Sequence, residues 1–339
     1  MKKYLSILLI TVLAILATAC GSEDSSANGN GESDEPLKVY THNNSDTMDA
    51  LVENIEKNTD VKLEVLRLSS GEGWSRIKSE APEFGADMQI GMLQGFGIKA
   101  AGEDYLMPYE AKNWDNVPDK YKDSDGKWYG TSFWYTSVGL NTDIFEDKGL
   151  DKPESWKDLL DPQYKGEIVM PDPGTSGTAF LFVSTILQTF GEEKGWNYLK
   201  ELDKNVAQYT KSGTAPAQMV AQGEYAIGIT WDKAVTDFKQ EGYPVEQFLP
   251  SEGVGYSLDV NWIFKNTDQP EKAKKVMDYL GSEKFMKKTA EFRSVVTKPG
   301  ISSGKNSDEL QEHFVDYDAK WAAENRDKVM KQWREEFSE

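Results

Sequence analysis

The apolar and polar positions along the chain follow two periods, one typical of strands and one typical of helices. Residues 61–68 (VKLEVLRL) alternate between apolar and polar side chains, whereas Met48, Leu51 and Ile55 recur at the spacing of one helix face. The pattern predicts strands at residues 37–41, 61–68, 86–91, 131–141, 166–170, 206–209, 225–230, 245–249 and 260–264. It predicts helices at residues 47–57, 74–80, 152–160, 179–190, 192–203, 214–222, 270–280, 283–291 and from 307 to the C-terminus.

This order of elements predicts an α/β fold with two lobes. Strands and helices alternate up to residue 131, which favours an open sheet with ligand-binding loops at its strand ends. A second α/β unit runs to about residue 250, and the chain then returns to the first unit. Because the chain crosses twice, we expect a hinged molecule with a cleft between its lobes. The expected boundaries are residues 36–133 plus 258–339 for lobe 1 and 134–257 for lobe 2.

The first 35 residues have the composition of an export and anchoring segment. Residues 1–19 combine an early positive charge, an apolar run and small residues, which is the layout of a secretory signal peptide. Cys20 is the only cysteine, so it has no partner for an internal disulfide. The stretch before it resembles a bacterial lipobox, which implies that Cys20 is lipidated; a plain cleaved signal is the alternative. Residues 20–35 predict a disordered tether, because small, polar and acidic residues bury too little apolar surface.

Charge and motif content narrow the classes of function. The formal net charge of −19 makes nucleic acid an unfavourable partner. The two histidines lie far apart, and the chain contains no HExxH, CxxC or GxSxG motif. We therefore expect a binding protein outside the cytoplasm with no enzyme activity, metal or cofactor. A lipid-anchored hydrolase using two carboxylates, or a sensor or adhesive protein, are the alternatives.

The turn at residues 171–179 (PDPGTSGTA) is the clearest local candidate for a binding site. It lies between a predicted strand and a predicted helix, so the unpaired first-turn amides and the helix dipole favour an oxyanion there. Thr175, Ser176 and Thr178 add hydroxyl donors, and Gly177 lets the backbone approach a ligand. The alternative is an ordinary N-cap that satisfies only its own helix.

Two further turns follow the same logic, and several polar and aromatic residues stand at strand ends. Residues 69–73, with Ser70 and Gly71, and residues 211–214 each join a strand to a helix. Loops at strand ends are where open α/β sheets bind ligands, and aromatic rings there suit a sugar or an amine. Surface capping and core packing are the alternatives. The remaining candidates for ligand contact are His42, Asn43, Trp134, Tyr135, Trp231, Asp232 and Asp259, and we expect two of Trp134, Tyr135, Trp231 and Trp262 to line the cleft.

Taken in order, several segments resemble a known family across roughly residues 36–300. The segments are LKVYTHNN, SSGEGWSRIKSEAPEFGADMQIG, WYTSVGLNTDIF, PESWKDLLDPQYKGEIVMPDPGTSGTAFLFV, APAQMVAQGEYAIGITW and NWIFKNTDQPEKAKKVMDYL. They resemble type II periplasmic binding proteins of the ferric-, 2-aminoethylphosphonate- and phosphosugar-binding group, within extracellular solute-binding family 1. The resemblance implies two α/β lobes that close on a solute, a monomer, and an ABC permease and ATPase as partners.

The resemblance also bears on the ligand. Ferric-binding members use two adjacent tyrosines after the strand that corresponds to residues 225–230. This chain has Trp231 and Asp232 there, which weighs against iron and leaves a ferric-binding protein as the alternative. We expect a small organic anion, either a phosphonate or a sugar phosphate.

Overall fold

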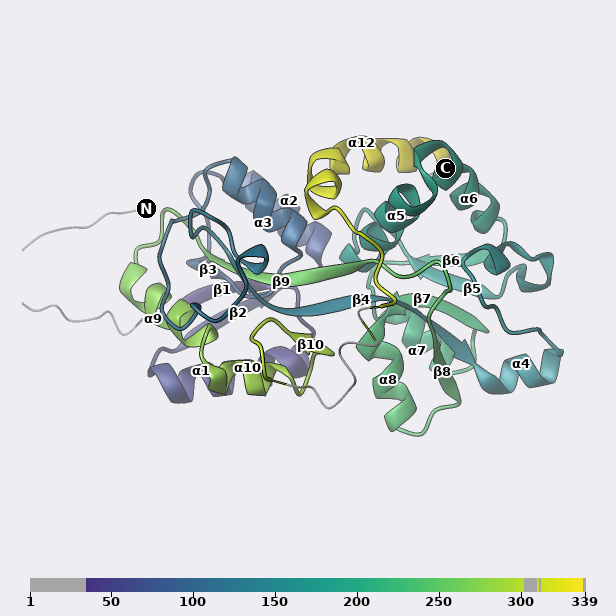
Figure 1. The fold of residues 1–339 in the computed structure, drawn as a ribbon, viewed down its shortest axis with the longest axis horizontal. Helices are drawn as coiled ribbons and strands as arrows, with labels where there is room; N and C mark the ends of the chain where they lie inside the picture. The colour runs from purple at the N-terminus through teal and green to yellow at the C-terminus, as the bar shows by residue number, and fades with distance from the viewer. Residues whose placement is uncertain (1–34, 302–309, 311, 338–339) are drawn as a thin grey trace, which may run out of the picture. The chain divides into compact units, whose positions relative to one another are not determined.

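The computed structural model describes residues 35–301, 310 and 312–337 (Figure 1). The predicted signal peptide, Cys20 and the tether up to residue 34 lie outside the described residues. The strands are β1 (Leu37–Thr41), β2 (Leu63–Arg67), β3 (Met88–Gln89), β4 (Tyr129–Asn141), β5 (Ile168–Pro171), β6 (Val206–Thr210), β7 (Ile227–Trp231), β8 (Val245–Phe248), β9 (Tyr256–Ile263) and β10 (Val295–Val296). None of the helices in the described ranges combines the length and apolar composition needed to cross a membrane.

The described residues also form α-helices, which pack around the strands (Figure 1). They are α1 (Ser45–Thr59), α2 (Ser70–Glu80), α3 (Gln94–Gly102), α4 (Thr142–Lys148), α5 (Gly177–Phe190), α6 (Glu192–Asp203), α7 (Ala215–Ala221), α8 (Asp232–Gln240), α9 (Pro270–Leu280), α10 (Glu283–Thr289) and α12 (Ala319–Phe337). Short 3-10 helices occupy Asp119–Tyr121, Lys157–Leu160 and Pro162–Tyr164.

Within the described residues, the strands form one 10-stranded sheet in the order β2-β1-β3-β9-β4-β7-β5-β6, with β8 and β10 paired to β4. β1 is parallel to β2 and β3, and β5 is parallel to β6 and β7. The antiparallel strands β4 and β9 pair with each other and join the two parallel groups, as Figure 1 shows. We call the β1–β3 side, with α1, α2, α3, α9 and α10, the first half. The β5–β7 side, with α4 to α8, is the second half.

Each half has its own apolar core. Leu37, Ile55 and Val276 pack together in the first half, and Ile168, Phe182 and Ile229 pack together in the second. All residues of α5 from Gly177 to Leu187 are buried, as expected of a helix that is apolar on every face. This burial fixes the first turn of α5 at the end of β5.

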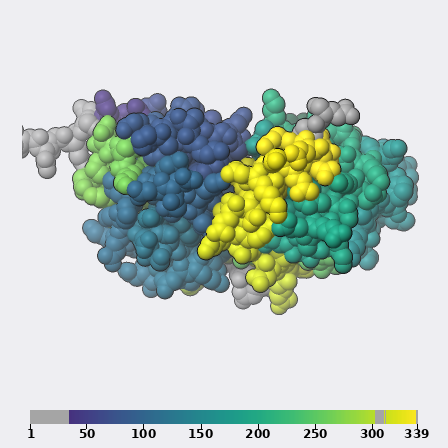
Figure 2. All heavy atoms as spheres, turned by 90° about the horizontal axis from the view of Figure 1, so that it is seen from above, coloured from purple at the N-terminus to yellow at the C-terminus, as the bar shows by residue number. Residues whose placement is uncertain are grey.

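The C-terminal helix α12 contacts both halves. Its Val329 and Trp333 join the core of the second half, and the helix also packs against α3 of the first half. Figure 2 shows this segment, in yellow, lying across the blue and teal segments. The lobe boundaries and the hinge remain predictions.

The structure confirms most of the predicted elements and corrects two. The helix predicted at 152–160 is wrong: only Lys157–Leu160 is helical, as a 3-10 turn. Asp158 Oδ2 accepts from the Glu154 and Ser155 amides, and the Trp156 amide donates to Glu252 Oε2 (2.9 Å), so these amides do not start a helix. The last helix begins at Ala319, because Phe314 instead forms a bridge with Val254. Residues 302–309 and 311 of that prediction lie outside the described residues.

Candidate functional site

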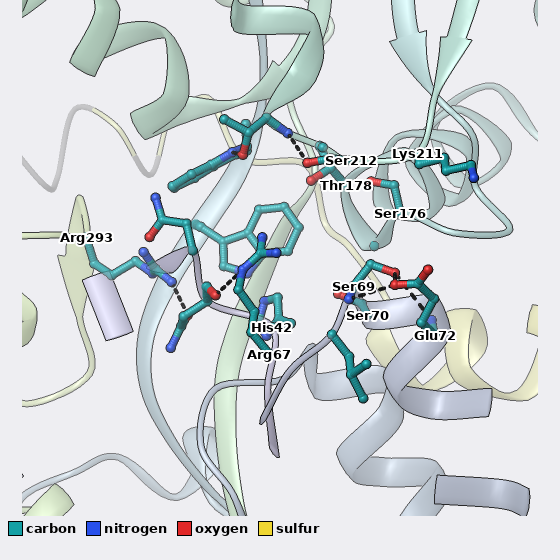
Figure 3. Close-up of a pocket in the computed structure, with 18 residues that line it drawn as sticks. His42, Arg67, Ser69, Ser70, Glu72, Ser176, Thr178, Lys211, Ser212 and Arg293 are labelled. Atoms are coloured by element: carbon teal, nitrogen blue, oxygen red, sulfur yellow. Dashed lines mark hydrogen bonds between the residues drawn. The ribbon is translucent and has the colours of Figure 1, made fainter. Parts of the chain in front are cut away.

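A cavity of about 230 Å³ lies where loops of the two halves meet (Figure 3). The first half contributes the ends of β1 and β2, the first turn of α2, and Arg293. The second half contributes the β5–α5 and β6–α7 turns, and the long strand β4 and the end of β7 add indole rings. Its lining residues are His42, Asn43, Asn44, Arg67, Leu68, Ser69, Ser70, Glu72, Trp134, Ser176, Gly177, Thr178, Lys211, Ser212, Gly213, Thr214, Trp231 and Arg293.

The structure brings together eight of the candidate residues from the sequence. Those that line the cavity are His42, Asn43, Ser70, Trp134, Ser176, Gly177, Thr178 and Trp231. Of the four aromatic rings considered for the cleft, Trp134 and Trp231 line it, whereas Tyr135 and Trp262 lie in the cores. Their role in binding remains a prediction.

The other five candidates lie beside the cavity and hold its parts in place. Gly71 and Thr175 join the two turns, since the Gly71 amide donates to Thr175 O (3.3 Å). The Tyr135 amide donates to Asp232 Oδ1 (3.3 Å), and Ser294 also donates to the Asp232 carboxylate. Asp259 accepts from Arg293. In this structure these five residues therefore contact other protein groups, Gly71, Thr175 and Tyr135 through their backbone and Asp232 and Asp259 through their carboxylates.

The first turn of α5 offers unpaired amides to the cavity. Ser176 is the N-cap, and its Oγ accepts from the Ala179 amide (3.4 Å). The amides of Gly177 and Thr178 have no hydrogen-bond partner in the part of the chain that the structure describes. No acidic residue occupies this first turn. It is therefore suited to an anion.

Glycine is required where the β6–α7 turn crosses this helix start. A Cβ at Gly213 would collide with Thr178 Oγ1 and lie 3.2 Å from Ser176 Oγ. A Cβ at Gly71 would likewise collide with Gly174 O. The three small-residue turns predicted from sequence thus meet at one place, because Gly71 and Gly213 have no side chain at the points where the turns approach most closely.

Two arginines that the sequence reasoning missed supply positive charge. Arg67 is the last residue of β2, and its Nε donates to Asn43 O (2.8 Å). Arg293 is buried; its Nε donates to Asp259 Oδ2 (2.6 Å) and its Nη2 to Asn43 Oδ1 (2.5 Å). Arg67 could have been found as a polar residue at a strand end. Arg293 could not, because it lies 250 positions from Asn43.

The remaining charged side chains on the lining are Lys211 and Glu72. Lys211 lies in a predicted turn, but Figure 3 shows its side chain extending away from Ser176 and Thr178. Glu72 closes the first turn of α2, where it accepts from the amide and hydroxyl of Ser69. Those hydrogen bonds lower the pKa of Glu72, so it carries its charge at neutral pH. The lining residues therefore include three cations and one carboxylate, in a chain of net charge −19, although one of the cations, Arg293, is also paired with Asp259.

His42 is held in one tautomer beside the cavity. Its Nδ1 lies 2.7 Å from Gly91 O, so Nδ1 carries the proton and donates it. Burial lowers the pKa of His42 below 6.5 and outweighs the opposing effect of Asp259, whose Oδ1 lies 3.6 Å from Nε2. At neutral pH the imidazole is neutral, and Nε2 can accept a hydrogen bond.

The donor set does not resemble a metal centre. Within the described ranges, no three or more His, Cys, Asp and Glu side chains gather as metal ligands. No tyrosine stands among the described residues that line the cavity. The lining instead combines amides, hydroxyls, guanidinium groups and indole rings.

Comparison with known proteins identifies the family. The model of the bacterial extracellular solute-binding protein family matches residues 85–318. The chain belongs to this family. An uncharacterized protein of Haemophilus influenzae is 29% identical over 98% of this chain and 98% of its own length. The spermidine/putrescine-binding periplasmic protein of Escherichia coli is 29% identical over 50% of this chain and 49% of its own length.

Solved structures agree with this assignment. The periplasmic binding protein AfuA from Actinobacillus pleuropneumoniae, with fructose-6-phosphate bound, superposes with a TM-score of 0.84 at 29% identity. The match covers 90% of this chain and 99% of AfuA. It confirms the predicted periplasmic-binding-protein fold and the role of an extracellular solute-binding protein.

Proposed function

We propose that this protein captures a small organic phosphate or phosphonate for an ABC importer, with a sugar phosphate as the preferred ligand. The observation that carries the proposal is the lining of the 230 Å³ cavity. The unpaired amides of Gly177 and Thr178 and the hydroxyls of Ser176 and Thr178 belong to the same lining as the guanidinium groups of Arg67 and Arg293. Figure 3 shows Ser176, Thr178, Arg67 and Arg293 around the cavity. Such groups recognise phosphate oxygens.

The organic part of the ligand has its own surface. Trp134 and Trp231 line the same cavity and provide apolar faces on which a sugar ring can stack. His42 Nε2 supplies an acceptor for a hydroxyl. The structural neighbour AfuA has fructose-6-phosphate bound. A ligand of that kind, with a phosphate and a sugar, matches the groups on this lining. A bare phosphate would leave the rings and the imidazole without a partner.

The charge of the cavity argues against the two other ligand classes. The spermidine/putrescine-binding relatives act on polycations, but here three cations and only one carboxylate line the cavity. For ferric iron, the lining offers neither tyrosine nor a carboxylate cluster among the described residues. Iron remains the alternative that the binding experiment tests.

A contact between the first turn of α2 and the β5–α5 turn suggests how the two halves close. The bond from the Gly71 amide to Thr175 O (3.3 Å) connects α2 of the first half to the β5–α5 turn of the second. We propose that the two halves open and close by a hinge motion about β4 and β9, and that a buried ligand stabilises the closed form, in which this contact is made. An ABC permease and ATPase would then receive the closed form. Lipidation of Cys20 would keep the monomeric protein at the cell membrane.

The test is a binding panel measured by calorimetry on the mature chain. The panel contains fructose 6-phosphate, 2-aminoethylphosphonate, inorganic phosphate, spermidine and ferric citrate. We expect fructose 6-phosphate or the phosphonate to bind at least ~100-fold more tightly than spermidine, since each tenfold step is about 1.4 kcal/mol. Tight iron binding without phosphate binding would refute the proposal. Assay of released phosphate in the same samples tests the hydrolase alternative.

Thr178→Val gives a sharper test of the site. Valine keeps the shape of Thr178 against Gly213 but removes the hydroxyl donor. Thr189→Val is the matched control, because Thr189 is exposed near the other end of α5. We expect weaker phosphate binding only in the first variant, with both proteins folded. Equal affinities would mean that the α5 turn is only a cap.

A further inference from the structure

A second, smaller cavity lies where α3, α5, α12 and β9 meet, separate from the ligand cavity. Its volume is about 20 Å³, enough for one water or one small ion. Lys99 of α3 and Arg326 of α12 line it, together with Phe96, Phe180, Ser257 and Tyr317. Among the described residues, no aspartate or glutamate belongs to the lining.

Arg326 is buried and forms no salt bridge with the described residues. It is 6% exposed, and its guanidinium stacks on Phe180 and Phe96, with the Cζ atom 4.1 and 4.8 Å from the ring centroids. Its Nη2 makes a long hydrogen bond to Pro173 O (3.4 Å). Its Nη1 is buried and has no hydrogen-bond partner in the described ranges.

The neighbouring acid favours the charged form of Arg326 but forms its salt bridge with another cation. Asp327, the next residue, pairs through Oδ2 with Lys99 Nζ (2.7 Å) and has an exposed side chain. Tyr317 does not supply a negative charge to Arg326 either, because its hydroxyl is hydrogen-bonded to Ser184 Oγ (2.9 Å). Ser184 Oγ donates to Phe180 O (2.7 Å), so the shared proton belongs to Tyr317.

A buried guanidinium in this position is costly. Removal of a charge from water must be offset by an opposite charge or by hydrogen bonds to every donor. The two ring faces offset part of the cost. Burial lowers the pKa of Arg326 to about 10, and the group stays charged at neutral pH.

We propose that this cavity binds a small monovalent anion, chloride in solution, held by Arg326 Nη1, with Lys99, which also pairs with Asp327, as the second cation on the lining. The anion satisfies the unpaired Nη1 donors and supplies the missing negative charge. Phe96 and Lys99 belong to the first half and Phe180 to the second, so a bound anion also stabilises α12 across both. Pro173, which Arg326 contacts, lies in the turn that carries Ser176 and Thr178.

The first experiment measures binding of halide to the ligand-free protein. Thermal unfolding is followed at constant ionic strength while gluconate is replaced by chloride. We expect Tm to rise by about 2 °C as chloride passes a tenfold excess over its Kd. Bromide soaked into crystals should give an anomalous peak beside Arg326. A Tm that does not depend on the halide, with no bromide peak, would show that only water fills the cavity.

Variants separate this cavity from the ligand cavity, which also carries arginines. Lys99→Gln removes a lining cation while keeping most of the stem, and should abolish at least half of the chloride-induced rise in Tm. Arg67→Gln, in the ligand cavity, is the matched control and should keep the full rise. The opposite pattern would place the chloride in the ligand cavity and overturn the proposal. Because these measurements use no organic phosphate, their outcome does not depend on the proposed ligand.

Discussion

The helix starts of α2 and α5 resemble each other in sequence but differ in chemistry. Both follow a strand, both begin with a serine N-cap, and both meet at the ligand cavity. In α2, Glu72 closes a capping box with Ser69, so the helix neutralises its own first turn. In α5, no acid follows Ser176, and the next two amides stay unpaired within the described residues. The residue three positions after the cap therefore separates a self-contained helix start from one suited to an anion.

The largest expected effect comes from placing an acid in the open turn. Thr178→Asp puts a carboxylate beside the amides of Gly177 and Thr178, where it occupies their donors and repels phosphate. We expect the affinity for fructose 6-phosphate to fall by about 100-fold or more, measured by calorimetry. Thr189→Asp adds the same charge near the other end of α5 and should leave affinity within about twofold. Unchanged binding by Thr178→Asp would exclude this turn from the site.

Removal of each N-cap is the next comparison. Ser69→Ala and Ser176→Ala should each lower the free energy of unfolding by about 1 kcal/mol, measured by urea denaturation. Only Ser176→Ala should also weaken phosphate binding, by about tenfold, since its hydroxyl lies with the unpaired amides. Equal losses of affinity would mean that both helix starts hold the anion.

A third prediction concerns pH and the first half. Burial lowers the folded-state pKa of His42 below its unfolded value of 6.5. As pH falls below 6.5, the unfolded chain takes up a proton that the folded protein does not, so stability falls. The loss is at most about 1.4 kcal/mol per pH unit until the folded pKa is reached. His42→Asn should flatten the urea-derived stability between pH 6.5 and 5.5; an unchanged slope would assign it to other groups.

The sequence predicted the parts of this site that depend on local order. Strand alternation and helix starts are set by neighbouring residues, so the turns at 69–73, 171–179 and 211–214 were found. Arg293 was missed because its contact with Asn43 spans 250 positions. The helix predicted at 152–160 failed for a related reason: the carboxylate that binds the Trp156 amide comes from Glu252.

The direction of a side chain on a strand was equally hard to predict. Trp134 and Tyr135 are adjacent on β4, and their side chains point to opposite faces, so only Trp134 lines the cavity. Asp232 and Asp259 were chosen for their charge, but buried carboxylates are held by protein donors. Asp259 pairs with Arg293, and Asp232 accepts from the Tyr135 amide. Local sequence does not reveal such long-range partners.

The smallest effect is expected from removing the charge of Glu72 in the capping box of α2. Glu72→Gln removes the carboxylate that faces the cavity, while the amide oxygen can still accept from Ser69. The helix should lose little stability, and affinity for fructose 6-phosphate should rise by about twofold to fivefold at low salt, with the gain shrinking as salt screens it. Acid acts on stability instead: the hydrogen bonds from Ser69 lower the folded pKa of Glu72, so the contribution of its carboxylate to stability is present above pH 4.5 and is lost as pH falls through the folded pKa. If affinity fell instead, Glu72 would be a ligand contact, and the contrast between the two helix starts would have to be abandoned.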